Sequence, residues 1–504
     1  MKKYIKRNRN SNRKFILEFM ALALPIMLQS LTGNILNICD TMMVGKVSSI
    51  AISAVTVSNK IFMIFSLCTF GMASGISMFM SQYYGAENIK KAKNTYKFGL
   101  QACIIIGILF LGALTIMPEP LIRIFVKGDE IVYLALKYVD VVKWSYVPFA
   151  INQICAVYFR VFKKQHIPMN VSIVSVGVNI ILNYILIYGK LGMPAFGVSG
   201  AATATLLSRC IECSTLLIII LVIGREKEVF TRGYGSLSRR MKMEIMKKTI
   251  PLMFNEGIYA VALTLVFRNY CVVNEAYIPA VTVVDNVFDL VNVAFMGCAH
   301  AAGIVIGKVL GSGNIEEAKA KSKKLIVLGL VVSLMCSFVV ITISGFVPML
   351  FSLTGNLFGM ATTLLRTKAL FSWGQGYGLT VYFILRAGGD VKAVLLLDGL
   401  FNLYGPFLIS TLVTYCTAWP IQIVYMCTEA TYLLKIFIAT YFYKRGKWCR
   451  NLAVELKKKG GTCIMKKILN RMAKIGLEIV MYLFEHIFLV IGIAILIILL
   501  IAKM

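Results

Sequence analysis

Among the carboxylates inside long apolar stretches of the sequence, four are candidates for ion binding: Asp40, Glu256, Asp285 and Asp289. A charged side chain is costly at the depth of a lipid bilayer, so a carboxylate found there is expected to do chemistry. An apolar environment disfavours the charged form of an acid. Such a group can take up and release a proton, or bind a cation, near physiological pH. We therefore predict that these four residues bind an exchangeable cation.

Asp285 and Asp289 lie four residues apart, so a helix places both on one face. Two like charges on a buried face repel each other unless one is protonated or a cation bridges them. Together with Glu256 they form a predicted set of oxygen ligands for a proton or a sodium ion, and no other metal site is predicted. The alternative is that Asp285 and Asp289 form ion pairs across helices with Lys60 or Arg268.

A polar lining is predicted around Asp40. Asn179 and Asn183 are four residues apart and share a helix face, and Thr205 follows in the next apolar stretch. With Asp40, these side chains could line a polar cavity. The alternative is that they join neighbouring helices through hydrogen bonds.

Two prolines stand inside the apolar stretches that carry Asp40 and Glu256. Pro25 and Pro251 each remove a backbone hydrogen bond, which can bend a helix. We hypothesise that protonation of Asp40 changes the bend at Pro25, and with it the shape of the neighbouring cavity.

Long apolar helices must position these residues. Apolar residues make up 58% of the 504-residue chain and charged residues 15%, against about 25% charged in a soluble domain. Stretches of about 20 apolar residues, enough to cross a bilayer, recur along the chain, and the linkers between them are too short for a soluble domain. The twelve predicted spans are 15–43, 51–80, 97–117, 131–159, 168–189, 197–223, 249–272, 278–307, 325–347, 362–385, 393–415 and 419–443.

The formal charge of +30 is a topology signal. Most of the 53 Lys and Arg residues fall in alternate loops between the predicted spans. Because basic loops stay in the cytoplasm, we expect a multi-pass inner-membrane protein with a cytoplasmic N-terminus. The same distribution argues against nucleic-acid binding. The 13 cysteines are scattered through apolar segments and do not form a disulfide framework.

The two halves of the sequence align without a gap at an offset of 226 residues. Pro25 falls on Pro251, Gly71 on Gly297, Gly85 on Gly311 and Arg160 on Arg386. Both copies have the same loop polarity, so each crosses the membrane an even number of times. We predict an all-α protein of two six-helix bundles related by a direct pseudo-two-fold repeat, a transporter architecture.

The predicted organisation also includes segments outside the two bundles. An apolar run near the C-terminus is long enough to span a bilayer and has no counterpart in the repeat, so we predict an extra helix there. The expected parts are a basic N-terminus (1–14), a first bundle (15–223), a cytoplasmic linker (224–248), a second bundle (249–445), a basic amphipathic stretch (446–478) and the extra hydrophobic helix (479–502).

Short motifs along residues 15–445 resemble the multidrug and toxic compound extrusion (MATE) family. They are Pro25 and the segments 40–45 (DTMMVG), 81–86 (SQYYGA), 179–184 (NIILNY), 197–205 (GVSGAATAT) and 385–390 (LRAGGD). Each is short, but they occur in order and on a repeat. The resemblance implies twelve helices in two bundles, and the export of organic, often cationic, compounds in exchange for protons or sodium ions.

The resemblance also bears on single residues. It implies that Asp40 couples to a cation, and that the helix of Glu256 carries a cation ligand. One branch of the family has an aspartate at the position of Asn183, so the carboxylate pair of that branch is absent here. Another branch has an aspartate where this chain has Gln375, so the match to its sodium site is incomplete. We place Gln375 in the polar lining.

The predicted function is secondary active export of small organic, drug-like cations by antiport with protons or sodium ions. The alternative is a lipid-linked oligosaccharide flippase of the same superfamily. A flippase should have a cavity lined with basic residues, and Lys60 and Arg268 are the only obvious candidates for one. No ATPase motif or catalytic cluster is present, so an enzyme is not expected. We expect no cofactor, and a monomer that contacts its substrate and the lipid bilayer.

Overall fold

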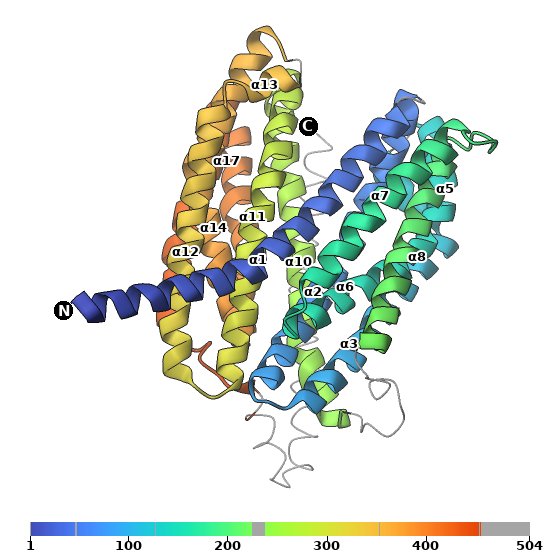
Figure 1. The fold of residues 1–504 in the computed structure, drawn as a ribbon. Helices are drawn as coiled ribbons and strands as arrows, with labels where there is room; N and C mark the ends of the chain where they lie inside the picture. Colours follow the sequence, from blue (N-terminus) through green and yellow to red (C-terminus); the bar gives the residue numbers. More distant parts are fainter. Residues whose placement is uncertain are drawn as a thin grey trace, which may run out of the picture. The chain divides into compact units, whose positions relative to one another are not determined.

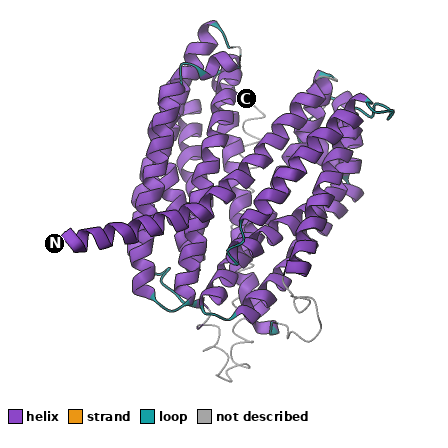
Figure 2. Cartoon of the chain, viewed as in Figure 1, coloured by secondary structure: helices purple, strands orange, loops and turns teal. Residues whose placement is uncertain are grey.

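The computed structural model describes residues 2–45, 48–126, 128–223, 237–351, 353–452 and 454. These residues form helices joined by turns, with no strand among them (Figure 2). The chain divides into two compact units, Met1–Ala453 and Val454–Met504. The predicted extra helix at 479–502 lies outside the described residues, as do most of the stretch 446–478 and the linker residues 224–236.

The first half contains α1, α2, α3, α5–α6, α7 and α8 as its six long segments (Figure 1). A short 3₁₀ turn, η1, joins α5 to α6 and interrupts the predicted span 131–159. Side chains of Ser48 and Asn88 cap the first turns of α2 and α3, as such residues do at helix starts. The bounds are α1 (Lys2–Gly45), α2 (Ser49–Gly85), α3 (Ile89–Ile116), α4 (Pro118–Arg123), α5 (Asp129–Val142), η1 (Lys143–Ser145), α6 (Tyr146–Val161), α7 (His166–Tyr188) and α8 (Val198–Ile223).

The second half repeats this order. Its fifth long segment is broken at Asp398 and again at a π-helical turn, η3, which contains Pro406. The bounds are α10 (Arg239–Val273), η2 (Glu275–Tyr277), α11 (Ile278–Gly311), α12 (Ile315–Ile343), α13 (Val347–Leu350), α14 (Gly355–Ala387), α15 (Val391–Leu397), α16 (Gly399–Asn402), η3 (Leu403–Phe407), α17 (Leu408–Cys416) and α18 (Ile421–Lys444).

The predicted all-α fold is confirmed. Each of the twelve predicted spans coincides with a helical segment, and ten helical segments in the described part of the chain are long and apolar enough to cross a membrane. Several helices extend beyond the predicted spans. α10 begins at Arg239 instead of residue 249, and the largest extension is that of α1, which begins at Lys2 instead of residue 15. No proline or glycine interrupts residues 2–14, so the basic N-terminus continues the helix.

Equivalent hydrogen bonds show the repeat in three dimensions. Gln29 donates to Ser172, and Asn255 donates to Asp398; each pair is 143 residues apart. At the repeat offset of 226 residues, Gln29 aligns with Asn255 and Ser172 aligns with Asp398. The halves pack against each other through α2 on α10 and α11, and through α1 on α11.

Candidate functional site

The first-half site is centred on Asp40, near the end of α1. Its side chain is buried, with 5% exposed. Asn183 of α7 donates its amide to Asp40 Oδ1 over 2.5 Å, and the Thr205 hydroxyl of α8 lies 3.4 Å from Oδ2. Asn183 also donates to Asn179 Oδ1 over 3.0 Å. The structure therefore brings together all four residues of the lining predicted around Asp40.

Asp40 has no basic partner at ion-pair distance among the described residues. Arg209 of α8 attracts it from farther away, but its guanidinium donates to Ser145 and lies over the Phe62 ring, 4.0 Å from the centroid. The carboxylate is thus held by neutral donors only. A buried acid in this state can bind a proton or a monovalent cation without displacing an ion pair.

The second-half site has a different chemistry because its carboxylates contact basic side chains. Glu256 of α10 accepts from Arg386 over 2.8 Å and from Tyr382 over 3.0 Å, both on α14. Asp398, at the break between α15 and α16, accepts from Asn255 over 3.1 Å and lies 3.3 Å from Lys435 Nζ of α18. Built-in cations thus occupy the places where a mobile cation would bind.

The structure does not bring Glu256, Asp285 and Asp289 together. The described residues contain no group of three or more His, Cys, Asp or Glu side chains placed to hold a metal ion. The turn η2 joins α10 to α11, and Glu256 lies farther from that turn than the two aspartates do. Asp285 pairs with Lys368 of α14 over 2.7 Å instead of with Lys60 or Arg268.

The remaining predicted residues lie within helices. Gln375 is half-buried on α14. Pro25 and Pro251 lie inside α1 and α10, both of which continue through the proline. Figure 1 shows α1 changing direction along its length, as a proline within a helix allows.

Four ionisable residues lie among the second-half carboxylates and their basic partners but are absent from the predicted set of site residues: Lys368, Asp398, Glu429 and Lys435. Each lies within a predicted span. The reasoning that selected Asp285, an ionisable group at bilayer depth, would have found them. Their pairing could not be found in that way, because the partners lie on different helices.

Replacing Glu256 with glutamine is expected to destabilise the protein. It removes the carboxylate from the buried Arg386, and breaking a buried pair in this way costs about 3–5 kcal/mol. The melting temperature of the purified protein should fall, and Glu256→Gln combined with Arg386→Gln should recover part of the loss. Glu316→Gln is the control, because Glu316 pairs with Lys319 on an exposed surface. An unchanged melting temperature in Glu256→Gln would contradict a structural role for the pair.

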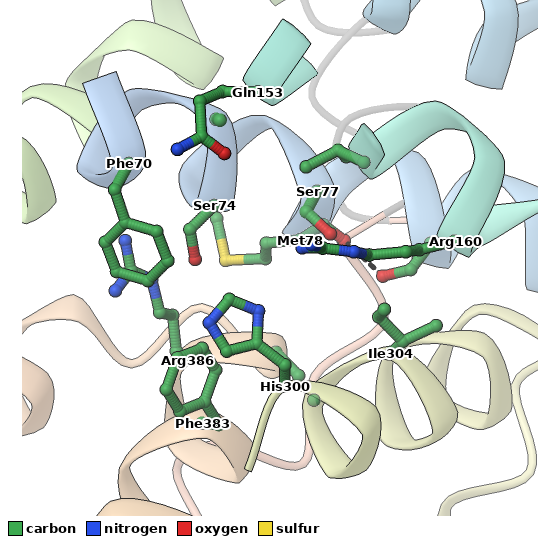
Figure 3. Close-up of a pocket in the computed structure, with 15 residues that line it drawn as sticks. Phe70, Ser74, Ser77, Met78, Gln153, Arg160, His300, Ile304, Phe383 and Arg386 are labelled. Carbon is green, nitrogen blue, oxygen red and sulfur yellow. Dashed lines mark hydrogen bonds between the residues drawn. The ribbon is translucent and has the colours of Figure 1, made fainter. Parts of the chain in front are cut away.

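A pocket lies between the two halves, lined by α2 and α6 from the first and by α11 and α14 from the second. Figure 3 shows His300 between the guanidinium groups of Arg160 and Arg386, with Ser74, Ser77 and Gln153 on the opposite wall. Phe70 and Phe383 flank the imidazole, with ring centroids 5.2 and 4.5 Å away. The equivalent arginines of the repeat thus meet at one pocket.

Comparison with known proteins assigns the chain. The MatE family model matches residues 25–185 and 234–427. The chain is 22% identical over 389 residues to the probable multidrug resistance protein NorM of Idiomarina loihiensis. This alignment covers 76% of this chain and 82% of that protein. It is 24% identical over 389 residues to the NorM protein of Pasteurella multocida, over 75% and 82% of the two chains.

The fold agrees with solved structures. One is described as the outward-facing conformation of a multidrug resistance MATE family transporter of the MOP superfamily. It aligns with a TM-score of 0.79 and 20% identity over 85% of this chain and 95% of the other. The multidrug names of the relatives do not favour the flippase alternative. The chain, a multi-pass membrane protein, belongs to the MatE family of multidrug and toxic compound extrusion transporters.

Proposed function

We propose that the protein exports small organic cations by antiport with protons or sodium ions, and that Asp40 is the residue that binds the coupling ion. One observation carries the proposal: Asp40 is a buried carboxylate that only neutral groups contact, whereas Glu256, Asp285 and Asp398 contact basic side chains. A mobile cation binds best where no resident cation competes with it.

The coupling ion acts through α1. Binding at Asp40 neutralises the charge to which Asn183 and Thr205 donate, so these hydrogen bonds weaken. The same helix carries Pro25 and, four residues later, Gln29. Gln29 accepts from Arg160 over 2.6 Å at the pocket between the halves. A change in the bend at Pro25 therefore moves a contact in the wall of that pocket.

The orientation of the protein in the membrane follows from the charges of the loops. The N-terminus and the linker 224–248 face the cytoplasm, so the ends of α2 and α11 at Gly85 and Gly311 lie on the cytoplasmic side. The protein works as a monomer in the inner membrane. The relatives named as multidrug resistance proteins support a drug-like organic substrate.

Ion-driven transport in proteoliposomes tests this function. The purified full chain is reconstituted, and a proton gradient or a sodium gradient is imposed separately. Uptake of a fluorescent organic cation is followed in each case. We expect one gradient to drive uptake above that of protein-free liposomes, and an ionophore that collapses this gradient to abolish it. Folded protein that takes up no cation under either gradient would rule out coupled export of organic cations.

A further inference from the structure

The pocket between the halves contains two buried arginines whose hydrogen bonding is incomplete. Arg160 on α6 is 9% exposed and Arg386 on α14 is 2% exposed. The Nε atom of each is buried and has no hydrogen-bond partner. Both side chains line the pocket, and Figure 3 shows their guanidinium groups on either side of His300. The wall of the pocket therefore carries two guanidinium groups.

The two arginines differ in how their charge is compensated. Arg386 pairs with Glu256 over 2.8 Å. The repeat places Ser30 where Glu256 stands in the second half, and the Ser30 hydroxyl donates to the carbonyl of Ile26 on its own helix. Arg160 consequently has no carboxylate at ion-pair distance among the described residues. It donates instead to the neutral amide of Gln29.

Hydrogen bonds connect Arg160 to an acidic group only through other side chains. Gln29 also donates to Ser172 over 3.5 Å, and Ser172 donates to Glu212 over 2.5 Å. Two neutral side chains thus separate the guanidinium from this carboxylate. A buried cation without a counter-charge is unfavourable, so the pocket has a place for one negative charge.

We propose that this pocket binds a small monovalent anion, either a chloride ion or an organic carboxylate the size of acetate. Its volume is about 40 Å³, which leaves room for a few water-sized groups. The two guanidinium groups come from different helices, with the hydroxyls of Ser74 and Ser77 in the same lining. Charged donors that approach from different sides favour a compact anion over a large, multiply charged one.

Anion binding does not require ion coupling at Asp40, because the anion site can be occupied whether or not the protein transports. Gln29 nevertheless connects the two, since it stands on the helix of Asp40 and contacts Arg160. An anion that draws Arg160 toward the pocket centre competes with this contact. Anion binding is thus expected to alter the position of α1 relative to α6.

Thermal unfolding of the purified full chain tests the site. Sodium gluconate is replaced stepwise by sodium chloride at constant ionic strength, because gluconate is too large for the pocket. A ligand that binds only the folded protein raises the melting temperature in a saturable manner. We expect such a rise for the wild type. Sodium acetate in a parallel titration tells the sources apart: a rise with acetate alone assigns the site to an organic carboxylate.

Three variants tie the effect to the pocket. Arg160→Gln should weaken the anion response at least ~30-fold, because it removes one partner of a buried charge pair. Arg123→Gln is the control, since Arg123 pairs with Glu119 and Asp129 on the surface, and its response should match the wild type. Ser74→Asp supplies the missing carboxylate from within the pocket. It should raise the melting temperature in gluconate and abolish the response to chloride and acetate.

Ser74→Asp decides the matter if Arg160→Gln does not fold. Its stabilisation in gluconate together with a lost anion response supports the site. Three results would overturn it: no saturable rise in the wild type with either anion, an unchanged midpoint in Arg160→Gln, or a Ser74→Asp protein that responds to anions as the wild type does.

Discussion

Asp40→Asn is expected to lower ion-driven uptake of organic cations strongly while the protein remains folded. Asparagine keeps the size of the side chain and its place beside Asn183 and Thr205, but it cannot bind a proton or neutralise a cation. The gradient then no longer drives the conformational cycle. The expected loss of uptake is about 5- to 150-fold, the range given by a coupling free energy of ~1–3 kcal/mol. The proteoliposome assay measures it directly.

Asp129→Asn is the matched control for this experiment. Asp129 is also an aspartate in the first half, but its side chain is 88% exposed and pairs with Arg123, which is itself 43% exposed. Surface ion pairs contribute little, so this variant should transport as the wild type does. Binding of the organic cation without a gradient should be similar in all three proteins, because Asp40 acts in coupling.

Retained gradient-driven uptake in Asp40→Asn would move the coupling ion to another carboxylate. Glu212 of the first half, which accepts from the neutral Asn152 and Ser172, would then be a candidate. At Glu256 or Asp398 the ion would have to displace Arg386 or Lys435. A variant that loses both uptake and substrate binding would instead place Asp40 in the substrate site.

The first-half cluster shows how much of a membrane site can be predicted from sequence. The apolar surroundings of Asp40 and the four-residue spacing of Asn179 and Asn183 were enough to group these residues. Helix periodicity fixes which residues share a face. In a chain dominated by spans, few polar residues are available to meet a buried carboxylate.

The second half shows where such prediction stops. Spacing placed Asp285 and Asp289 on one face but did not identify Lys368, 83 residues farther on, as the partner of Asp285. The residues that face each other on two helices depend on how far one helix is shifted along the other. This shift depends on loop lengths and on the packing of many side chains, and a single sequence does not determine it. The break at Asp398 was not predicted either. Its backbone contact comes from another helix, where Asn255 accepts from the amide of Gly399.

Gly85→Ala and Gly311→Ala are each expected to block transport by preventing the ends of α2 and α11 from meeting. A methyl group at Gly85 would overlap the backbone carbonyl of Lys308, and one at Gly311 would overlap that of Gln82. These two contacts are equivalent under the repeat offset of 226. Neither neighbour is a flexible side-chain end, so the helices must separate.

Separation of α2 from α11 should open the pocket between the halves to the cytoplasm. Overpacking costs about 1–3 kcal/mol, which shifts the balance between closed and open states by about 5- to 150-fold. The rate at which a membrane-impermeant maleimide labels Ser77→Cys from the cytoplasmic side measures this shift. Mass spectrometry of the labelled peptide is needed because the chain has 13 native cysteines.

Gly112→Ala and Gly177→Ala separate this effect from a general loss of helix flexibility. Both glycines lie inside helices, α3 and α7, and a methyl group on either would have no atom within 4 Å. These variants should transport and label as the wild type does. Equal labelling in Gly85→Ala and Gly177→Ala would mean that the ends of α2 and α11 at Gly85 and Gly311 do not form the seal. Faster labelling only in Gly85→Ala and Gly311→Ala would identify this pair of backbone contacts as the closure that each transport cycle must break and remake.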